Sequence, residues 1–405
     1  MRRHNLAAVL DRLHIGGAMS RSHLAGQTGL NRSTIRDLIS ELTDLGLVAE
    51  QPGTVKGRGR PSLVARPRPA GAVVLAVELE VDSMTVATIG LGGHIFERTR
   101  IAQAPPRSPE DIVDDLDRLG TPMFDSLPAD HTVAGVGVAV AGVVRRQDGF
   151  VHVAPNLGWE NVPLGQMFSE RMGIDRVMMA NEADLGALAE FRRGAAIGSQ
   201  HLIYLAGEVG VGIGVVTNGK PMLGAAGYAG EAGHTRINPS GRLCRCGATG
   251  CWETEVGEEA LARLVGISDP EMRADLIGEV TRRAHRGDAD TFAALKEIGH
   301  WLGVGIGNLV NTFNPDLVLI GGFFNELYPF LEESMKSTAN EVSLSAPWDA
   351  CTIRPSKLGI DAHLIGASEL VFAEVIANPS KSRDVSGTNL AVSGIPVSAA
   401  SQSAV

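Results

Sequence analysis

Residues 230–253 read GEAGHTRINPSGRLCRCGATGCWE, the densest group of reactive side chains in this chain of 405 residues. One imidazole, His234, is followed by three thiols, Cys244, Cys246 and Cys251, with glycines between them. Thiolate and imidazole are ligands that Zn²⁺ prefers, and four of them complete a closed tetrahedral site. Because a closed site leaves no position for water, we expect a structural zinc ion here. The alternative is three packed cysteines beside an unrelated histidine.

The number of cysteines and the distribution of apolar residues indicate where in the cell the protein is located. The fourth cysteine, Cys351, stands alone, and we expect it to be an ordinary core residue. Four cysteines in a chain of this length do not form a disulfide scaffold. Asp11 and Arg12 interrupt the apolar run Leu6–Leu10, so no signal-peptide core forms, and the uncharged run Thr132–Val144 is too short to span a bilayer. We therefore expect a soluble, cytoplasmic protein that makes no membrane contact.

Charge is distributed unevenly along the chain. The formal net charge is −10, but residues 1–70 hold 11 Lys and Arg against 5 Asp and Glu, a net of +6. The remaining residues hold 25 against 41, a net of −16. Apolar residues make up 44%, enough for a sizeable core, while only 4% aromatic residues disfavour a single-strand nucleic-acid platform. A basic head on an acidic body indicates that the head alone meets nucleic acid.

The basic head has helix-turn-helix spacing. A first helix is predicted over residues 4–13, and a second, short helix begins after Ser20 and ends near Gly26–Gly29. Asn31 is a good N-cap for a third helix, whose apolar stripe ends near Gly46. Two short strands then flank the basic loop KGRGRP within residues 52–61, as expected of a wing.

The third helix and the wing carry side chains suited to DNA. Polar and basic groups in the first turn of a recognition helix can reach base edges and phosphates, and a basic loop can reach the minor groove or the backbone. The alternative is a three-helix packing module with a solvated basic loop. The residues expected to contact DNA are Asn31, Arg32, Ser33, Thr34 and Arg36 on the helix, and Lys56, Arg58 and Arg60 in the wing.

The acidic body shows an internal repeat. Three strand-like runs, Val73–Leu79, Met84–Ile89 and His94–Ile101, are parted by tight turns. A similar meander is predicted over 201–206, 212–217 and Lys220–Leu223. Each meander is followed by helical and strand segments, which suggests a duplicated α/β architecture of two lobes around a cleft. Small-molecule sites commonly lie between such lobes.

The run from Gly230 to Glu253 resembles the signature of the ROK family, which comprises bacterial sugar kinases and sugar-responsive repressors. The similarity covers about residues 71–378, and the winged helix resembles the branch of xylose and N-acetylglucosamine repressors. Further similar segments are GVAVAG at 137–142, PNLGW at 155–159, Asn181 with its following acid, and NTFNPDLVLIGG ending at Gly322. The resemblance implies an α/β fold: a two-lobed actin/hexokinase (ribonuclease H-like) sugar-kinase fold with an N-terminal winged helix-turn-helix domain.

On this basis we expect four parts. Residues 1–70 would form the winged helix-turn-helix domain, and Arg66–Ala70 (RPRPA) a short, stiff linker. Residues 71–182 with 362–380 would form the first lobe, and residues 183–361 the second lobe with the zinc site. Residues 381–405, rich in Ser, Ala, Gly and Val without periodicity, would be a disordered tail.

The resemblance also implies a sugar site between the lobes. Carboxylates and amides can each engage two neighbouring hydroxyls, and a polar pocket rejects analogues that lack them. The zinc ion would fix the sugar-binding groups, and His234 could ligate zinc through one ring nitrogen and meet the sugar through the other. The bland alternative is that these are solvated surface groups. The residues expected to bind sugar are Asn156, Asn181, Glu182, Glu231, His234 and Glu253.

Three departures from the kinase pattern of the family disfavour phosphoryl transfer. Glu78–Met84 holds carboxylates and no glycine where kinases place a glycine-rich phosphate loop. The second phosphate loop reads Gly210-Val211-Gly212 and lacks a hydroxyl, and Glu182 replaces the aspartate that acts as base. Since catalytic geometry tolerates little displacement, we expect no enzyme activity.

The sequence therefore predicts a repressor of carbohydrate-metabolism genes that responds to a sugar or sugar phosphate and binds double-stranded operator DNA as a homodimer or homotetramer. Two alternatives stay open. One is a sugar kinase with residual ATP-dependent activity. The other is a DNA-binding regulator with a vestigial pocket that a partner protein controls.

Overall fold

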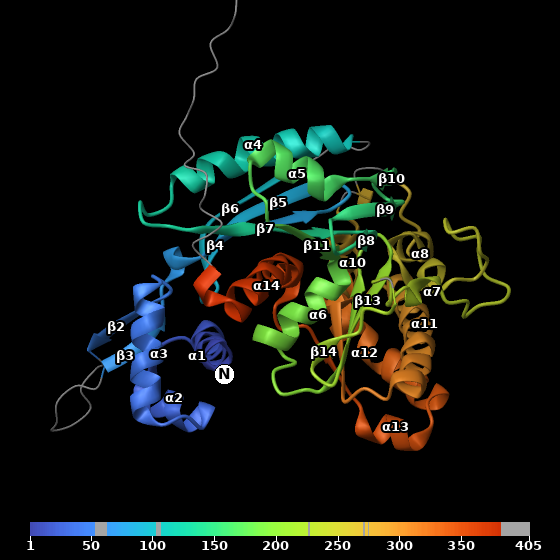
Figure 1. Cartoon of the computed structure of the whole chain (residues 1–405). Coiled ribbons are helices and arrows are strands. Elements are labelled where there is room, and N and C mark those ends of the chain that lie inside the picture. Colours follow the sequence, from blue (N-terminus) through green and yellow to red (C-terminus); the bar gives the residue numbers. More distant parts are fainter. Residues whose placement is uncertain (53–62, 103–106, 226, 270–271, 274, 382–405) are drawn as a thin grey trace, which may run out of the picture.

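The computed structural model describes residues 1–52, 63–102, 107–225, 227–269, 272–273 and 275–381, arranged as a small head and two α/β lobes (Figure 1). The head holds three helices, α1 (Arg2–Gly16), α2 (Arg21–Thr28) and α3 (Arg32–Asp44). Its sheet has the order β1-β3-β2, from β1 (Met19–Ser20), β2 (Val48–Pro52) and β3 (Leu63–Pro67). The predicted winged helix-turn-helix is confirmed in these elements.

Local signals explain why the head folds this way. The Ser20 side chain accepts a hydrogen bond from His23 N–H at the start of α2, and Asn31 accepts one from Thr34 N–H at the start of α3. Gly29, with φ 72°, ends α2 in the left-handed conformation that glycine adopts without strain. The stripe on α3 is buried and makes the core of the head: Ile35, Leu38, Ile39 and Leu42.

The first lobe is built on a five-stranded sheet of order β11-β7-β4-β5-β6. Its strands are β4 (Val73–Leu79), β5 (Ser83–Gly90), β6 (His94–Ala102), β7 (Val133–Val140) and β11 (Val177–Asn181). Helices α4 (Pro109–Asp125) and α5 (Leu164–Met172) cover one face, and α14 (Ala362–Ala377) covers the other (Figure 1). A small sheet of β8 (Val143–Arg145), β9 (Phe150–Ala154) and β10 (Trp159–Val162) extends toward the second lobe.

The second lobe repeats this plan with the sheet order β14-β13-β12-β15-β16. Its strands are β12 (His201–Gly207), β13 (Val211–Thr217), β14 (Lys220–Pro221), β15 (Leu317–Gly322) and β16 (Thr352–Pro355). In both sheets an antiparallel meander is joined by parallel strands, so the predicted duplication and fold class are confirmed. The strand expected at Lys220–Leu223 is shorter than predicted, because pairing stops at Pro221.

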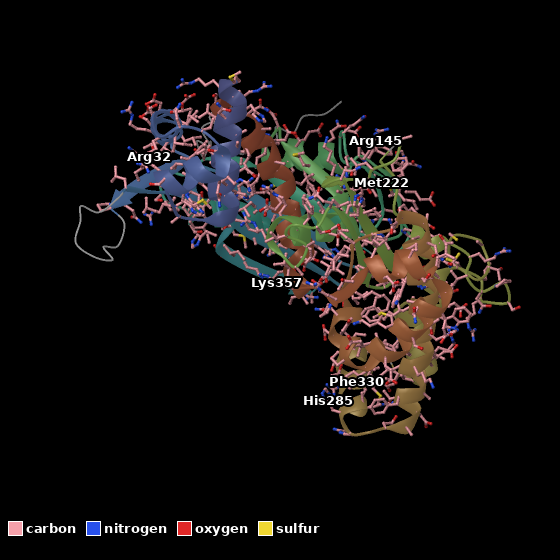
Figure 2. All side chains as sticks on the ribbon, turned by 90° about the horizontal axis from the view of Figure 1, so that it is seen from below. Arg32, Arg145, Met222, His285, Phe330 and Lys357 are labelled. Atoms are coloured by element: carbon pink, nitrogen blue, oxygen red, sulfur yellow. The ribbon has the colours of Figure 1, made fainter. Side chains whose placement is uncertain are left out.

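Helices surround the second sheet. Helix α6 (Glu182–Arg193) packs on β12 and β13, and the long helices α11 (Ala289–Phe313) and α12 (Phe323–Val342) pack against each other. Figure 2 places His285 and Phe330 at the end of the molecule opposite to Arg32 on the head. Within the described residues, this lobe also contains α7 (Trp252–Val256), α8 (Glu258–Leu264), α10 (Leu276–His285) and α13 (Ser345–Ala350).

Two expectations about single segments need correction. Arg66 and Pro67 belong to β3, Arg68 donates hydrogen bonds to Gly46 O (3.0 Å) and Asp130 O (2.9 Å), and Ala70 is buried. The segment Arg66–Ala70 is therefore part of the packed structure and does not act as a spacer.

Cys351 is only half-buried and lies at the edge of the second-lobe core, because α13 ends beside it at the surface.

Two further predictions lie outside the described residues: the wing side chains Lys56, Arg58 and Arg60, and the tail beyond Lys381. Within the described ranges, no helix combines the length and the apolar character needed to cross a membrane.

Candidate functional site: a pocket between the lobes beside a histidine–cysteine cluster

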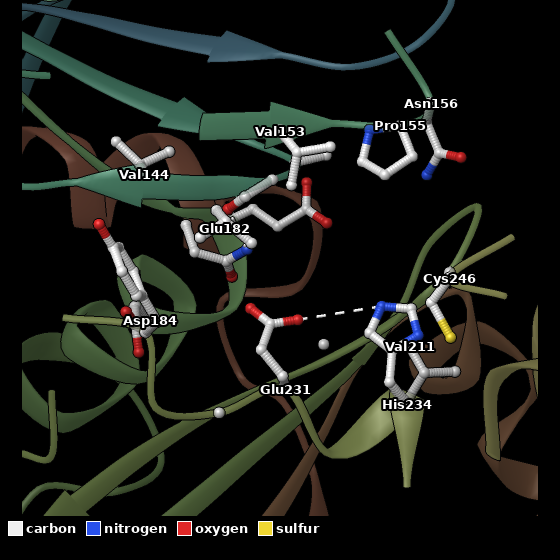
Figure 3. Close-up of a pocket in the computed structure, with 18 of the residues that line it drawn as sticks. Val144, Val153, Pro155, Asn156, Glu182, Asp184, Val211, Glu231, His234 and Cys246 are labelled. Atoms are coloured by element: carbon white, nitrogen blue, oxygen red, sulfur yellow. Dashed lines mark hydrogen bonds and ion pairs between the residues drawn. The ribbon is translucent and has the colours of Figure 1, made fainter. Parts of the chain in front are cut away.

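A cavity of about 950 Å³ lies between the two lobes (Figure 3). The first lobe lines it with the loop after β7 and with the small sheet, and the second lobe lines it with the start of β13 and the segment 227–234. The structure brings all six predicted sugar-binding residues to this one cavity: Asn156, Asn181, Glu182, Glu231, His234 and Glu253.

Asn181 and Glu182 reach the cavity where β11 ends and α6 begins. The Asn181 side chain accepts a hydrogen bond from Ala183 N–H (2.8 Å) and donates one to Gly142 O (3.1 Å). Asn181 thus caps α6 and ties it to the loop after β7. Burial raises the pKa of Glu182 to about 7, and the neighbouring Glu78 and Glu80 add to this effect, although His363 opposes it.

Glu231 and His234 lie on a short turn that faces the cavity from the second lobe. Glu231 Oε2 is 4.0 Å from His234 Nε2, and burial raises the pKa of the Glu231 carboxyl (Figure 3). Gly233 permits this turn to approach β13, because a Cβ at that position would collide with Val211 O. One ring nitrogen of His234 therefore faces a carboxylate of the pocket.

The other ring nitrogen of His234 faces the three thiols. Nδ1 lies 3.6 Å from Cys244 Sγ, and Cys246 Sγ lies 3.6 Å from Cys251 Sγ. All four ligand atoms lie within 4.8 Å of one another, and the cysteines are free. The donor set fits a metal ion, because three thiols and one imidazole converge without a disulfide.

Backbone bridges give the cysteine loop its shape. Arg236 pairs with Cys251 and Leu243 pairs with Thr249, so two short antiparallel bridges close the loop. Gly250 adopts φ 79°, and a Cβ there would collide with Asn238 O. Glu253, directly after the loop, accepts a hydrogen bond from Val211 N–H (3.4 Å) and lies 3.8 Å from Cys244 Sγ. Glu253 thus lies between the cysteine cluster and the cavity.

Sequence analysis missed several side chains that line the cavity. Arg146 pairs with Asp184 (2.8 Å), and Arg245 Nη1 donates to Asn156 Oδ1 (2.7 Å) across the two lobes. Arg146 lies four positions after the similar segment GVAVAG, but nothing in the sequence pairs it with Asp184, 38 residues later. Tyr228, which also lines the cavity, forms a 2.5 Å hydrogen bond with His152 of β9 and so makes a second link between the lobes.

Carboxylates gather near the end of β4. The His363 ring lies 2.9 Å from Glu78 Oε1, and although burial alone would lower the pKa of His363, Glu78 raises it to about 9. Burial raises the pKa of Glu208 to about 8, and the neighbouring carboxylates add to this effect while His363 opposes it. Acidic side chains therefore gather in the region where kinases of the family place phosphate loops. A polyphosphate would be repelled by them whenever they are ionised.

The residues predicted to contact DNA are exposed where the structure describes them. Arg32, Ser33 and Arg36 are exposed in the first turns of α3, and Figure 2 shows Arg32 on the outer side of the head. Thr34 is half-buried, and the Asn31 side chain is engaged in capping. Ser33 donates to Asn31 Oδ1 (2.7 Å) and Arg36 pairs with Asp37 (3.0 Å), so these side chains are exposed but bonded within the helix. A helix with exposed polar side chains at its N-terminus is the arrangement that enters a major groove.

The chain is similar to known proteins over most of its length. The ROK family profile matches residues 74–374. A xylose repressor of Caldicellulosiruptor bescii is 32% identical, with 93% of this chain and 97% of that protein aligned. The xylose repressor of Bacillus subtilis is 29% identical over 91% of this chain and 94% of its own. A glucokinase of Streptomyces coelicolor is 26% identical and covers 74% of this chain and 97% of its own.

Solved structures agree in fold. A ROK family transcriptional regulator described as a homologue of the Escherichia coli MLC protein has a TM-score of 0.77 and 25% identity, and covers 94% of this chain and 98% of its own. A ROK glucokinase from Streptomyces griseus, solved with glucose and AMPPNP, has a TM-score of 0.64 and 27% identity, and covers 74% of this chain and 98% of its own. This protein belongs to the ROK family.

Proposed function

We propose that the protein is a sugar-responsive transcriptional repressor. The observation that carries this proposal is the similarity to xylose repressors over 91–93% of the chain, whereas the glucokinase alignment covers 74%. A chain that couples a helix-turn-helix head to an inter-lobe pocket has the two sites that such a regulator needs. Repression and sugar response are the properties named in those relatives, and they are proposed here for this chain.

The proposed sugar site uses the polar groups of the 950 Å³ cavity. Asn156, Asn181, Glu182, Glu231, His234 and Glu253 would engage hydroxyls, since an amide or a carboxylate can satisfy two neighbouring hydroxyl groups. D-xylose is the first sugar to test, because the relatives carry its name. Glu182 would restrict which sugars fit the pocket, since its side chain is one methylene longer than the aspartate of related kinases.

The proposed metal is a structural zinc ion held by His234 Nδ1 and the thiols of Cys244, Cys246 and Cys251. When bound, zinc supplies no open coordination position, so its contribution is to hold the loop. His234 would then present its Nε2 to the pocket in a fixed orientation, 4.0 Å from Glu231.

The proposed DNA contact is made by the head. Arg32, Ser33, Thr34 and Arg36 would meet bases and phosphates of a double-stranded operator, capped by Asn31, and Lys56, Arg58 and Arg60 would meet the backbone or minor groove beside them. Two recognition helices are needed for a two-fold operator, so we propose that the chain works as a homodimer or a homotetramer in the cytoplasm.

A sugar kinase is the second candidate, because glucokinases align with the body of this chain at 26% identity. Residues 78–84 carry acidic side chains and no glycine where kinases of the family place a phosphate loop, which disfavours a bound nucleotide. A regulator with a vestigial pocket and a partner protein as its input is the third.

A thermal-shift screen against free and phosphorylated sugars, each with and without Mg-ATP, separates the three. A ligand that binds only the native state raises the Tm by mass action. At a ligand concentration of one hundred times Kd, the free energy of unfolding rises by about 2.7 kcal/mol. The proposal predicts a rise with one sugar that ATP leaves unchanged. An additional rise with ATP, together with a phosphorylated product, would establish the kinase, and silence across the panel would favour the partner-controlled regulator.

A further inference from the structure

A buried group of polar side chains joins the head to the body. His14 of α1 and Glu369 of α14 have side-chain exposures of 0% and 1%, and His14 Nε2 lies 3.0 Å from Glu369 Oε1. Gly92 N–H donates to His14 Nδ1 (2.9 Å), and His14 Nε2 faces both the Glu369 carboxylate and Arg193 Nη2 (2.6 Å). Burial lowers the pKa of His14, which keeps the ring neutral at pH 7.

Two arginines from the C-terminal end of α6 complete this group. Arg192 Nη2 donates to Asp11 Oδ1 of α1 (2.6 Å), and its Nε donates to Glu369 Oε2 (3.3 Å). Arg193 also donates to Glu369, and its Nη2 lies 3.3 Å from His14 O. Two guanidinium groups therefore balance two carboxylates at the contact of three helices. We call Asp11, His14, Arg192, Arg193 and Glu369 the head cluster.

Helix α6 spans the distance between the pocket and the head cluster. Its N-terminal end carries Asn181, Glu182 and Asp184, which all line the cavity. Its C-terminal end carries Arg192 and Arg193 of the head cluster. Twelve residues at 1.5 Å per residue make a rod of about 18 Å. A displacement of the pocket end along this axis reaches the head without any intervening loop.

Helix α14 accompanies α6 along this path. Gly366 allows the two helices to touch, because a Cβ there would collide with Leu185 O. Toward the pocket, His363 of α14 interacts electrostatically with Glu182 of α6. Toward the head, Glu369 of α14 accepts hydrogen bonds from Arg192 and Arg193 of α6. In Figure 1, α14 lies between α1 and α6, so both helices of the pair are in position to act on the head.

We propose that α6 and α14 transmit sugar occupancy from the pocket to the DNA-binding head, and that the head cluster is the contact through which they move it. This inference rests on the proposed sugar pocket. Polar contacts at both ends of a stiff helix suit such a role, since hydrogen bonds and ion pairs can exchange between discrete arrangements. Asp11, Arg192, Arg193 and Glu369 are positioning residues in this scheme, since they lie at the end of α6 away from the pocket.

Asp11→Asn is the variant that tests the proposal with least risk to the fold. Asp11 is one-third exposed (33%), and the substitution keeps its shape while removing its charge from Arg192. The matched control is Asp117→Asn, which weakens the pair of Asp117 with Arg171 between α4 and α5 of the first lobe at similar exposure (30%) and lies away from the head, α6 and α14. Asp11→Glu restores the carboxylate and serves as the conservative variant.

The measurement is hydrogen–deuterium exchange of the α1 amides in the full chain, with and without saturating D-xylose, or another sugar that passes the thermal-shift screen, beside the sugar Kd by calorimetry. We expect sugar to change α1 exchange by about fivefold or more in the unmodified protein, the lower end of ordinary allosteric coupling. Asp11→Asn should bind the sugar with unchanged Kd yet lose this response, while Asp11→Glu and Asp117→Asn keep it.

Sugar binding that leaves α1 exchange unchanged in the unmodified protein would overturn the inference while the proposed sugar site stands. So would a full response in Asp11→Asn. If no sugar binds, the proposed function fails instead. The α1 exchange rates of the sugar-free samples then still test whether the head cluster holds the head on the body. Asp11→Asn must then exchange faster in α1 than Asp117→Asn does, and equal rates would overturn the head cluster as the link.

Discussion

At the scale of single residues, His234 contacts two different groups of the site. His234 offers Nδ1 to the cysteine cluster and Nε2 to Glu231 of the pocket. This double role follows from the sequence, since one imidazole stands between an acid and three thiols. Arg245 is different: its bond to Asn156 crosses the lobes over 89 positions, and no local pattern marks such a partner. Residue types therefore predict ligands well and cross-lobe contacts poorly.

The cysteine cluster can be tested by one thiol. Cys246→Ser should lower the zinc content of the purified protein to well below one ion per chain, because the hard hydroxyl is a poor replacement for thiolate. A loss of about 2 kcal/mol in the free energy of unfolding would lower the Tm by about 4–8 °C. Elemental analysis and calorimetry measure both, and Cys351→Ser is the control. A metal-free unmodified protein would contradict the assignment.

Glu208 makes stability depend on pH. Its pKa is raised from 4.5 to about 8 by burial and by Glu182, Glu78 and Glu80, with His363 opposing. The folded state therefore holds more protons than the unfolded chain between these values, so the free energy of unfolding falls as pH rises through this window. Above the folded pKa the stabilising contribution of the neutral acid is lost.

Glu208→Gln should therefore raise the Tm by much more at pH 8.5 than at pH 5.5, where only about one pH unit of the interval between 4.5 and 8 has been crossed. Thermal melts of both proteins across this range measure the effect. Glu160→Gln, an exposed acid in β10, is the control and should shift neither end. An equal gain for Glu208→Gln at both pH values would show that its carboxyl does not titrate in this window.

At the scale of elements, the helices of the head were predictable and the roles of α6 and α14 were not. Caps and apolar stripes are local signals, so Ser20, Asn31 and the stripe of α3 lead directly to the observed helices. The head cluster joins residues up to 355 positions apart, and its members look like ordinary surface charges in the sequence. Only the packing of α14 against α1 and α6 brings them together, with His14 and Glu369 buried at the centre.

The cap of α3 gives a test at this scale. Asn31→Ala removes the hydrogen bond from Thr34 N–H and should cost about 1 kcal/mol of stability in the head. Asn31→Ser supplies another capping oxygen and should recover most of that loss. Hydrogen exchange in the first turn of α3 is the direct measure. Equal protection in the alanine and serine variants would mean that the cap contributes nothing there.

At the scale of the whole molecule, the duplication of the lobes was visible in the sequence, whereas the docking of the head was not. Two meanders at regular spacing lead to two sheets of matching order. The segment Arg66–Ala70 was expected to be a short, stiff linker, but Arg68 and the head cluster fix the head against the body. The head is therefore placed where a change between the lobes can reach it, which is what a regulator of this design requires.

The central claim is that sugar in the pocket weakens the hold of the head on DNA. Operator duplexes selected from a random pool by the unmodified protein would provide the DNA, and fluorescence anisotropy at fixed salt would give its Kd with and without saturating sugar. We predict that sugar weakens operator binding by about 5- to 150-fold, the range of ordinary allosteric coupling. An operator Kd that stays the same while calorimetry shows the sugar bound would contradict the account.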